Sequence, residues 1–549
     1  MWLYANRPTS TAAAILALRY VLLLPVLATQ LRRRDPQDDG AMIEREGAET
    51  GNALASQIRF PPSVRTQIAI FVLAAAPLAW YWGHGQTISD ESSYRFQARL
   101  FAAGRIAAVA PPVNPDDFGG GNEIPFAGCI LYRGHWFSKY PPGWPAVLAV
   151  ADRLGAGWLA PVLLSGGILL LTGAFAATLF GERTGRLAVL LAIASPYFLF
   201  DSMGYLSHPL CGLLVAAAAY FWLLGVRRAS HWPYWAMFAA VAMAMQVRPF
   251  TAFCVGLVLG PAALWQARKT AKRVAQVAAA GITCGACALG AMAFYNHALT
   301  GSYWRSTYAL SRGLDIPVEV TPSLALLSKE VLDQKRWSME NTAVNSFPFL
   351  FLLGFWCVMK EPRQRLEVAV LGLLYAAVVA GYLVQRERST CAYGERYYFE
   401  VFFGVCILAA RGISLLFRRS GWSPRSCSHA FLALLAAQAC VFAVLTPKML
   451  SLTSYSARVY AAFRQVTSPH TVFFAQDPPG IDAINEARKF NPNGADWPSA
   501  SAFYLPDPGP QLRDAETRRL GRSRWVVFRD GAVAEWHLVD SRDPHPVLH

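Results

Sequence analysis

The chain has 549 residues, of which 54% are hydrophobic and only 15% are Asp, Glu, Lys or Arg. Soluble globular chains are about 45–50% apolar and about 25% charged, so this composition excludes an ordinary soluble domain and favours a polytopic membrane protein. The formal net charge is +15, but the basic residues lie in short clusters between apolar runs. That distribution is typical of cytoplasmic loops and argues against binding of nucleic acid.

The N-terminal segment, residues 1–64, contains an apolar run at 11–30 that is followed by Arg32, Arg33 and Arg34. A cleaved signal peptide carries its positive charge before the apolar core, so this run is instead predicted to be an extra helix, across the membrane or at its surface. Residues 31–62 are charged and polar without a periodic apolar face, which predicts a cytoplasmic linker.

Apolar runs of membrane-spanning length then recur along the chain. They lie near residues 66–82, 158–181, 187–201, 208–226, 232–247, 250–266, 274–295, 344–359, 366–384, 399–417 and 429–446. The expected fold is therefore an all-α polytopic membrane protein with about 11 transmembrane helices, or about 12 if residues 11–30 also cross.

The basic residues supply a check on this count. If each run crosses once, nearly every basic cluster in a short loop falls on one face, as the positive-inside rule requires of the cytoplasmic side. These clusters contain Arg183, Arg186, Arg227, Arg228, Arg268, Lys269, Lys272, Arg273, Lys360, Arg363, Arg365, Arg418, Arg419 and Arg425. The first loop at 88–142, the turn at 201–208, the loop at 296–343 and everything after 446 are then expected to be external.

The external parts are predicted to hold some structure of their own. Tyr94 to Ala108 has helical apolar spacing, which suggests a helix in the membrane interface. Thr471 to Ala475 and Arg524 to Phe528 read as short strands, and Asp530-Gly531 is a hairpin signal. We therefore expect a membrane domain at 65–446 and a small external α/β domain at 447–549. Whether the external Cys129 and Cys391 pair stays open.

Two adjacent carboxylates, Asp90 and Glu91, follow the first span of the membrane domain. A carboxylate at the edge of a membrane can act as a general base toward a hydroxyl, bind a cation, or cap the helix that follows. The sequence leaves these three uses open. No set of residues with metal-ligand spacing accompanies the pair, so no metal site or cofactor is predicted, and a requirement for a divalent cation is left open.

Three cations are expected on the same face. Lys139, in Ser138-Lys139-Tyr140-Pro141, is the only Lys between residues 88 and 143; it suits an anionic lipid headgroup or a side chain that snorkels to the interface. Arg248 lies at an external turn, where it breaks the positive-inside pattern and needs a partner. Arg396 begins another span in Gly394-Glu395-Arg396-Tyr397.

The order of these motifs resembles that of the GT-C glycosyltransferases, in particular the bacterial branch related to protein O-mannosyltransferases and to lipid A aminoarabinose transferases. The motifs are Asp90-Glu91 with Tyr94, Ser138-Lys139-Tyr140-Pro141-Pro142-Gly143, Arg248-Pro249, Tyr295-Asn296 with Gly301, and Gly394-Glu395-Arg396-Tyr397. They cover roughly residues 65 to 420. The separation of Asp90 from Lys139 is longer than in the aminoarabinose branch, and Gly119-Gly120-Gly121 lies within it.

The resemblance implies transfer of a sugar from a polyprenyl-phosphate donor to an acceptor hydroxyl of a lipid, glycan or protein. It places the protein in a bacterial inner membrane with its active site external. Asp90 would be the general base, Glu91 its support, and Lys139 a contact of the donor phosphate. Because external arginines suit bidentate phosphate contacts, we add Arg248 and Arg396 to the donor site. Tyr94, Tyr140, His208 and Tyr397 are expected to line the pocket.

Two other classes of function are compatible with parts of the sequence. A lipid or solute transporter or flippase would place its charges along a pathway near the middle of the bilayer and often shows paired repeats, but no internal repeat is present. A non-catalytic subunit of envelope-glycan assembly would act through the domain after residue 446, and substitution of Asp90 would leave it unaffected.

Overall fold

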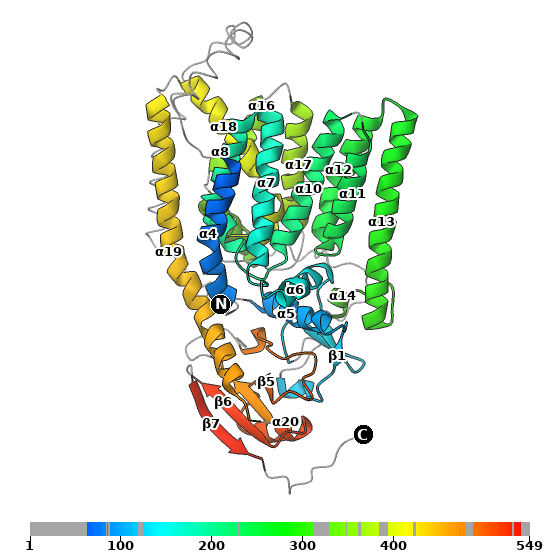
Figure 1. The fold of residues 1–549 in the computed structure, drawn as a ribbon, viewed down its shortest axis with the longest axis vertical. Coiled ribbons are helices and arrows are strands. Elements are labelled where there is room, and N and C mark those ends of the chain that lie inside the picture. The colour runs from blue at the N-terminus through cyan, green and yellow to red at the C-terminus, as the bar shows by residue number, and fades with distance from the viewer. Residues whose placement is uncertain are drawn as a thin grey trace.

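The computed structural model describes residues 63–539, with gaps at 84, 86–87, 119–124, 229, 312–328, 347–348, 361–363, 384–393, 421–423, 469, 478–486 and 530–531. The run at 11–30, the linker at 31–62, the glycines at 119–121, Cys391 and the dipeptide 530–531 thus lie outside the described residues. Figure 1 shows a bundle of helices at one end of the molecule and a small sheet domain at the other.

Seven helices among the described residues are long and apolar enough to cross a membrane, which makes the chain a multi-pass membrane protein. They are α4 (Val64–Gly83), α7 (Ala160–Phe180), α10 (His208–Arg227), α12 (Pro249–Ala267), α13 (Ala271–Thr300), α17 (Arg365–Leu383) and the segment Arg396–Phe417, formed by η3 (Arg396–Val401) and α18 (Phe402–Ser420).

The four other runs predicted to span have a different form. They correspond to α8 (Glu182–Ile193) with α9 (Pro196–Asp201), α11 (Trp232–Met245), α16 (Phe349–Lys360), and part of the 42-residue α19 (Pro424–Gln465), in which the apolar stretch is Leu435–Pro447. The run expected to span at 187–201 is not one continuous helix, because Ser195 and Pro196 interrupt it. Ser195 is extended and its side chain accepts a hydrogen bond from the Phe198 N–H, while Pro196 starts the new helix.

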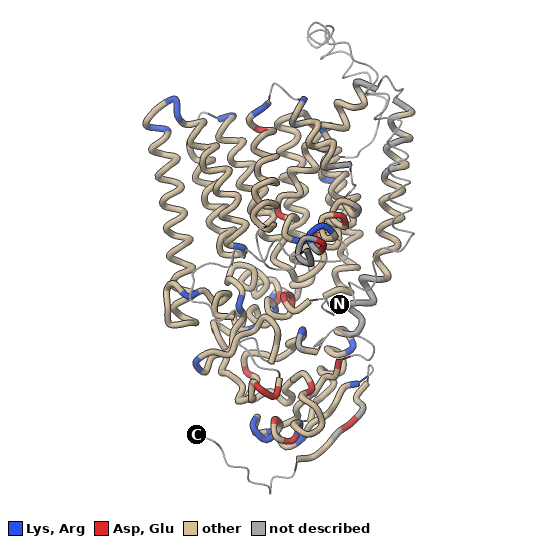
Figure 2. The backbone as a smooth tube through the Cα atoms, turned by 180° about the vertical axis from the view of Figure 1, so that it is seen from behind, with Lys and Arg blue, Asp and Glu red and all other residues tan. Residues whose placement is uncertain are grey.

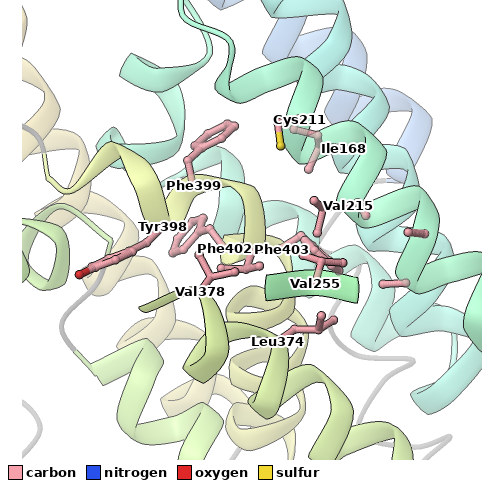
Figure 3. Packing of buried hydrophobic residues seen from close by; sticks show 14 of the residues in the cluster. Ile168, Cys211, Val215, Val255, Leu374, Val378, Tyr398, Phe399, Phe402 and Phe403 are labelled. Atoms are coloured by element: carbon pink, nitrogen blue, oxygen red, sulfur yellow. The ribbon is translucent and has the colours of Figure 1, made fainter. Parts of the chain in front are cut away.

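The centre of the bundle is closed by η3 and the start of α18. Figure 3 shows Phe399, Phe402 and Phe403 from this segment among side chains of the surrounding helices. Those neighbours are Ile168 of α7, Cys211 and Val215 of α10, Val255 of α12, and Leu374 and Val378 of α17. Because the segment is surrounded on all sides, any charged residue within it must find its partner inside the protein.

The two ends of the bundle differ in charge. Figure 2 shows Lys and Arg gathered at the ends of helices that are remote from the sheet domain. The direction of the helices agrees, since α10 ends at Arg227 and α12 ends just before Arg268. This basic end is the one that the positive-inside rule would place in the cytoplasm.

At the other end, the 88–142 segment is folded. It contains α5 (Ser89–Ala102), β1 (Ala108–Val109), η1 (Pro115–Phe118), β2 (Cys129–Tyr132) and β3 (His135–Ser138), and α6 (Gly143–Arg153) follows it. The strands form an antiparallel sheet in the order β1-β3-β2. The segment expected as an external loop at 296–343 is also partly helical. It contains α14 (Thr307–Ser311) and most of α15 (Lys329–Asn345).

Helix α5 differs from the interfacial helix expected at Tyr94 to Ala108. It begins five residues earlier, at Ser89, and ends at Ala102, shortly before Gly104 adopts a left-handed conformation with φ of 72°. Its apolar side chains Phe96 and Leu100 are fully buried against the C-terminal domain. The apolar spacing therefore reflects packing on protein and not on lipid.

The C-terminal domain was expected to begin at residue 447, but α19 continues through that residue to Gln465. The domain of the structure comprises residues 466–539. It contains β4 (Thr471–Ala475), η4 (Ala487–Lys489), β5 (Ala502–Pro506), α20 (Arg513–Arg519), β6 (Arg524–Arg529) and β7 (Ala532–Leu538). The strand order is β5-β4-β6-β7. Strand β4 pairs in parallel with β5 and β6, and β6 pairs antiparallel with β7.

The C-terminal domain and the 88–142 segment share one hydrophobic core. Trp136 of β3 lies 6.2 Å from Phe503 of β5, measured between ring centroids. The Arg99 guanidinium of α5 donates to the Asn493 carbonyl at 3.0 Å, and Trp497 Nε1 donates to the Val109 carbonyl at 2.8 Å. The two parts are therefore held together by both apolar packing and directed polar contacts.

Glu516 of α20 lies buried at this junction. Its carboxylate accepts a 3.4 Å hydrogen bond from the Asn114 N–H of the 88–142 segment. Arg519 contacts Glu516 and lies 2.6 Å from Asp117 Oδ2. Burial raises the pKa of Glu516 to about 7, and a hydrogen bond to Asp117 adds to the shift, because both favour the protonated carboxyl.

We expect the stability of the folded protein to fall as the pH rises toward 7. The folded-state pKa of Glu516 is about 7, above the ordinary value of 4.5, so the folded protein holds a proton that the unfolded chain has released. The stabilisation from this proton is complete below the pKa of Glu516 in the unfolded chain. It is lost as the pH rises through the pKa of Glu516 in the folded protein. Thermal unfolding of the full-length protein between about pH 5 and pH 8 measures this trend. Glu516→Gln should flatten it, and an equally steep curve for that variant would refute the assignment.

Candidate active site

Asp90 lies in the first turn of α5, and its carboxylate faces the bundle. Its Oδ2 is 2.8 Å from Arg396 Nη2, and the Tyr140 hydroxyl donates a hydrogen bond to it. The N-cap of α5 is Ile88, which provides no capping side chain. Asp90 therefore does not cap a helix that begins near Tyr94, because it lies within α5, which begins at Ser89.

The ionisation of Asp90 is set by opposing effects. Burial raises its pKa, but Arg396, Lys139 and the Tyr140 hydrogen bond, with a smaller contribution from Arg248, together hold the pKa below its ordinary value. Burial, followed by the nearby Asp90 charge, raises the pKa of Tyr140 well above its ordinary value. Asp90 is therefore an anion and Tyr140 a neutral hydrogen-bond donor at neutral pH.

Lys139 is brought to Asp90 by the β2–β3 hairpin. Ser138, the last residue of β3, is clamped to α5: its Oγ lies 2.6 Å from Ser93 Oγ, and its N–H donates to Gln97 Oε1 at 2.9 Å. Gly128 allows the close approach, since it has φ of 83° and a Cβ there would lie 2.9 Å from the Ser93 Cβ. These contacts bring Lys139 close to Asp90 although the two residues are far apart in the sequence. No motif in the sequence predicted these contacts.

The Lys139 side chain is half-buried between aromatic rings. Its Nζ lies 5.4 Å from the ring centre of Tyr140 and 5.2 Å from that of Tyr308 in α14. The Thr307 hydroxyl donates to the Lys139 carbonyl at 2.8 Å and so fixes α14 over this side chain. Lys139 is thus oriented by cation–π contacts toward the Asp90 side of the site.

Arg248 is held by a carboxylate that the sequence analysis did not single out. Its Nε lies 2.9 Å from Glu400 Oε1 in η3, and His208 Nδ1 lies 2.8 Å from the same oxygen. The guanidinium also donates to the Tyr382 hydroxyl at 3.1 Å and to Ser207 Oγ at 3.4 Å. All of these side chains are buried, so Arg248 and His208 are joined in one network whose acceptor is Glu400.

The predicted pocket tyrosines surround these charges. Tyr397 stacks on Tyr382 with ring centres 4.5 Å apart, and the Arg248 and Arg396 guanidinium carbons lie 4.7 and 5.4 Å from its ring centre. Tyr94 packs on Tyr140 at 4.5 Å. Its hydroxyl lies 3.1 Å from Ser207 Oγ. The aromatic rings therefore connect the Asp90 and Arg248 sides of the site.

Glu91 is turned away from the Asp90–Arg396 pair. It is buried, and its Oε1 accepts a 2.9 Å hydrogen bond from the Tyr205 N–H in the turn between α9 and α10. Gly204 leaves room for this contact, since a Cβ there would lie 2.4 Å from the same oxygen. Glu91 thus fixes the turn that carries Ser207 and His208.

Asp201, at the end of α9, is fully buried, and neither of its carboxylate oxygens has a hydrogen-bond partner in the described part of the chain. Within the same described residues, no three His, Cys, Asp or Glu side chains are grouped so as to hold a metal ion.

Cys129, whose pairing with Cys391 was left open above, is buried, and its Sγ accepts a hydrogen bond from Asn491 Nδ2 at 3.6 Å.

No protein-family model matches the chain, and no curated protein matches it in sequence. Solved structures do. The oligosaccharyltransferase of Archaeoglobus fulgidus, tethered to an acceptor peptide, has a TM-score of 0.50 at 12% identity, over 84% of this chain and 68% of that one. ArnT from Cupriavidus metallidurans, bound to undecaprenyl phosphate, has a TM-score of 0.45 at 16% identity, over 72% and 68%. The mycobacterial arabinofuranosyltransferase AftD has a TM-score of 0.47 at 14% identity, over 84% and 35%.

The oligosaccharyltransferase is a GT-C glycosyltransferase, and the match to it shows that the chain has this fold. The fold expected from the order of the motifs is thus confirmed. At these identities the fold is the feature that is shared.

Proposed function

We propose that this chain is a membrane glycosyltransferase that transfers a sugar from a polyprenyl-phosphate donor to an acceptor hydroxyl, on the external face of a bacterial inner membrane. The observation that carries the proposal is the half-buried Asp90 carboxylate, 2.8 Å from Arg396 and with Lys139 and Tyr140 beside it. A carboxylate can accept the proton of a hydroxyl, and the cations can bind a phosphate. The ArnT structure with undecaprenyl phosphate supports a lipid-linked donor for this fold.

The proposed step is a direct displacement at the anomeric carbon. The acceptor oxygen forms a bond to that carbon while Asp90 takes the hydroxyl proton. The bond from the carbon to the phosphate oxygen breaks, its electron pair leaves with the polyprenyl phosphate, and the configuration of the sugar inverts. Lys139 and Arg396 stabilise the charge on the leaving phosphate. Tyr140 orients Asp90 by its hydrogen bond.

Arg248 and Glu91 receive supporting roles. The Arg248 guanidinium is already paired with Glu400, so we assign it to holding Tyr382 and Ser207 in place and to the positive field of the site, in place of a bidentate phosphate contact. Glu91 supports the site through the Tyr205 turn. Tyr94, Tyr140, His208 and Tyr397 remain the proposed lining of the pocket.

Deletion and complementation would test this function. Mass spectrometry of envelope glycans, lipids and glycoproteins from a strain that lacks the chain should show the loss of one sugar modification. Wild-type protein should restore it, and Asp90→Asn should not. Restoration by Asp90→Asn would reject the enzyme and favour a non-catalytic subunit.

We expect Lys139→Ala to weaken use of the donor. Loss of one charged hydrogen bond to the phosphate should raise the donor KM by about 10- to 100-fold. Steady-state kinetics at varied donor concentration measures it, with Lys272→Ala, at the exposed start of α13, as the matched control. An unchanged donor KM and rate for Lys139→Ala would exclude the phosphate contact.

The position of the charges favours an enzyme over a transporter. Asp90 and Lys139 belong to the 88–142 segment, while His208 and Arg248 lie at the beginnings of α10 and α12. These helices run from there to their basic ends at Arg227 and Arg268. A transport pathway would place such charges toward the middle of the bilayer.

A further inference from the structure

The two arginines of the site, Arg248 and Arg396, are held in different ways. Arg248 pairs with Glu400, and these side chains are 9% and 0% exposed. Arg396 pairs with Asp90, and these are 11% and 19% exposed. Glu400, the partner of Arg248, thus takes part in no proposed chemical step and is inaccessible to solvent. The partner of Arg396 is the proposed base and lies at the open side of the site.

This pairing suppresses the chemistry that Asp90 is proposed to perform. Its carboxylate receives the Arg396 guanidinium at 2.8 Å and the Tyr140 hydrogen bond, with Lys139 nearby. The Ser89 hydroxyl donates to its other oxygen at 3.4 Å, and the pKa of Asp90 lies below the ordinary value. A general base is most effective when its pKa is near the working pH, so the paired Asp90 is a poor base.

We infer that Arg396 exchanges partners: the phosphate of the lipid-linked donor takes the guanidinium from Asp90, and only then is Asp90 free to accept the proton of the acceptor hydroxyl. This inference rests on the proposed function, because it requires a donor phosphate at this site. It makes the base active only when the donor is bound, so the donor binds before the acceptor reacts.

The surroundings of Arg396 suit such an exchange. Its guanidinium carbon lies 5.4 Å from the ring centre of Tyr397, so an aromatic face lies beside the cation. Tyr140 keeps one hydrogen bond to Asp90 after Arg396 leaves. A planar guanidinium binds phosphate through two parallel hydrogen bonds, which makes the phosphate an effective competitor for it. Arg248 cannot serve instead without leaving Glu400 buried and unpaired.

Binding of undecaprenyl phosphate tests the exchange without knowledge of the sugar. The full-length protein would be placed in nanodiscs of zwitterionic lipid, and its affinity for the lipid phosphate measured. We expect Asp90→Asn to bind about 10-fold more tightly than wild type, because Arg396 no longer has to leave a carboxylate. Asp116→Asn is the matched control, since it makes the same substitution at an exposed carboxylate of the 88–142 segment, in η1. Its affinity should stay within about 2-fold of wild type.

A double-mutant cycle separates the exchange from a general effect of charge. Arg396→Gln should weaken binding, and adding Asp90→Asn to it should then give no further gain. A gain that persists in the Arg396→Gln background would reflect the loss of a nearby negative charge alone and would overturn the exchange. Undecaprenol, which lacks the phosphate, should bind wild type and Asp90→Asn equally.

Two results distinguish failure of the exchange from failure of the proposed function. If wild type does not bind undecaprenyl phosphate, or if Lys139→Ala binds it as tightly as wild type, the donor site is wrong and the exchange falls with it. If wild type binds, Lys139→Ala binds more weakly, and a correctly folded Asp90→Asn shows no gain, the donor site stands and the exchange is wrong.

Discussion

Asp90→Asn should reduce sugar transfer by about 10²- to 10⁴-fold, the usual cost of losing a general base. Asn has the same shape and still accepts the Tyr140 hydrogen bond, but it cannot take up the proton of the acceptor hydroxyl. The loss should appear in kcat, while donor binding is retained or improved. Turnover of a polyprenyl-linked donor by purified protein measures it.

The control for this variant is Glu91→Gln, whose side chain faces the Tyr205 turn on another side of α5. It should retain most of the wild-type kcat, since it keeps the hydrogen bond that fixes the turn. Near-wild-type turnover by Asp90→Asn would remove Asp90 from the reaction. Equal losses in both variants would show that a negative charge on α5 is needed, without a specific proton acceptor.

Arg248→Met should destabilise the folded protein by about 3–5 kcal/mol, because Glu400 would remain buried without its cation. Glu400 is fully buried in η3, and its other close partner is the His208 ring, 2.8 Å away. Thermal unfolding in detergent, followed by tryptophan fluorescence, measures the change. Adding Glu400→Gln to Arg248→Met should recover much of the lost stability, since no buried charge is then unpaired.

The outcome of this pair also bears on the role of Arg248. If Arg248→Met unfolds at the wild-type temperature and fails only in donor binding, Arg248 contacts the substrate directly. If the double variant is stable and still binds undecaprenyl phosphate, its role is to position its neighbours, as the Glu400 contact indicates.

Hydropathy and the positive-inside pattern predicted which charged residues would lie on the same face. They placed Asp90, Lys139, Arg248 and Arg396 at one end of the bundle, although up to about 300 residues separate them. The reason is that each membrane span fixes the face on which the next loop emerges. The face of a loop can therefore be predicted from the sequence even where its tertiary contacts cannot.

The partners within the site were harder to predict. Glu400 stands alone in the apolar run Tyr398-Phe399-Glu400-Val401-Phe402, and a carboxylate in such a run is itself a signal of a buried partner. The Ser93–Ser138 clamp has no such signal, because serine is common in loops and its contact depends on tertiary structure. Hydropathy also could not show that the span at 187–201 breaks, since the residues on both sides of Ser195 and Pro196 are apolar.

The shared core of the 88–142 segment and the C-terminal domain has a consequence for how the protein matures. Trp136 packs on Phe503, and Phe126 packs on Tyr504, so the 88–142 segment is supported by residues that the ribosome adds much later. The hairpin that presents Lys139 therefore lacks this support until β5 has been made. A chain truncated before β5 would keep the apolar helices and lose this support for Lys139.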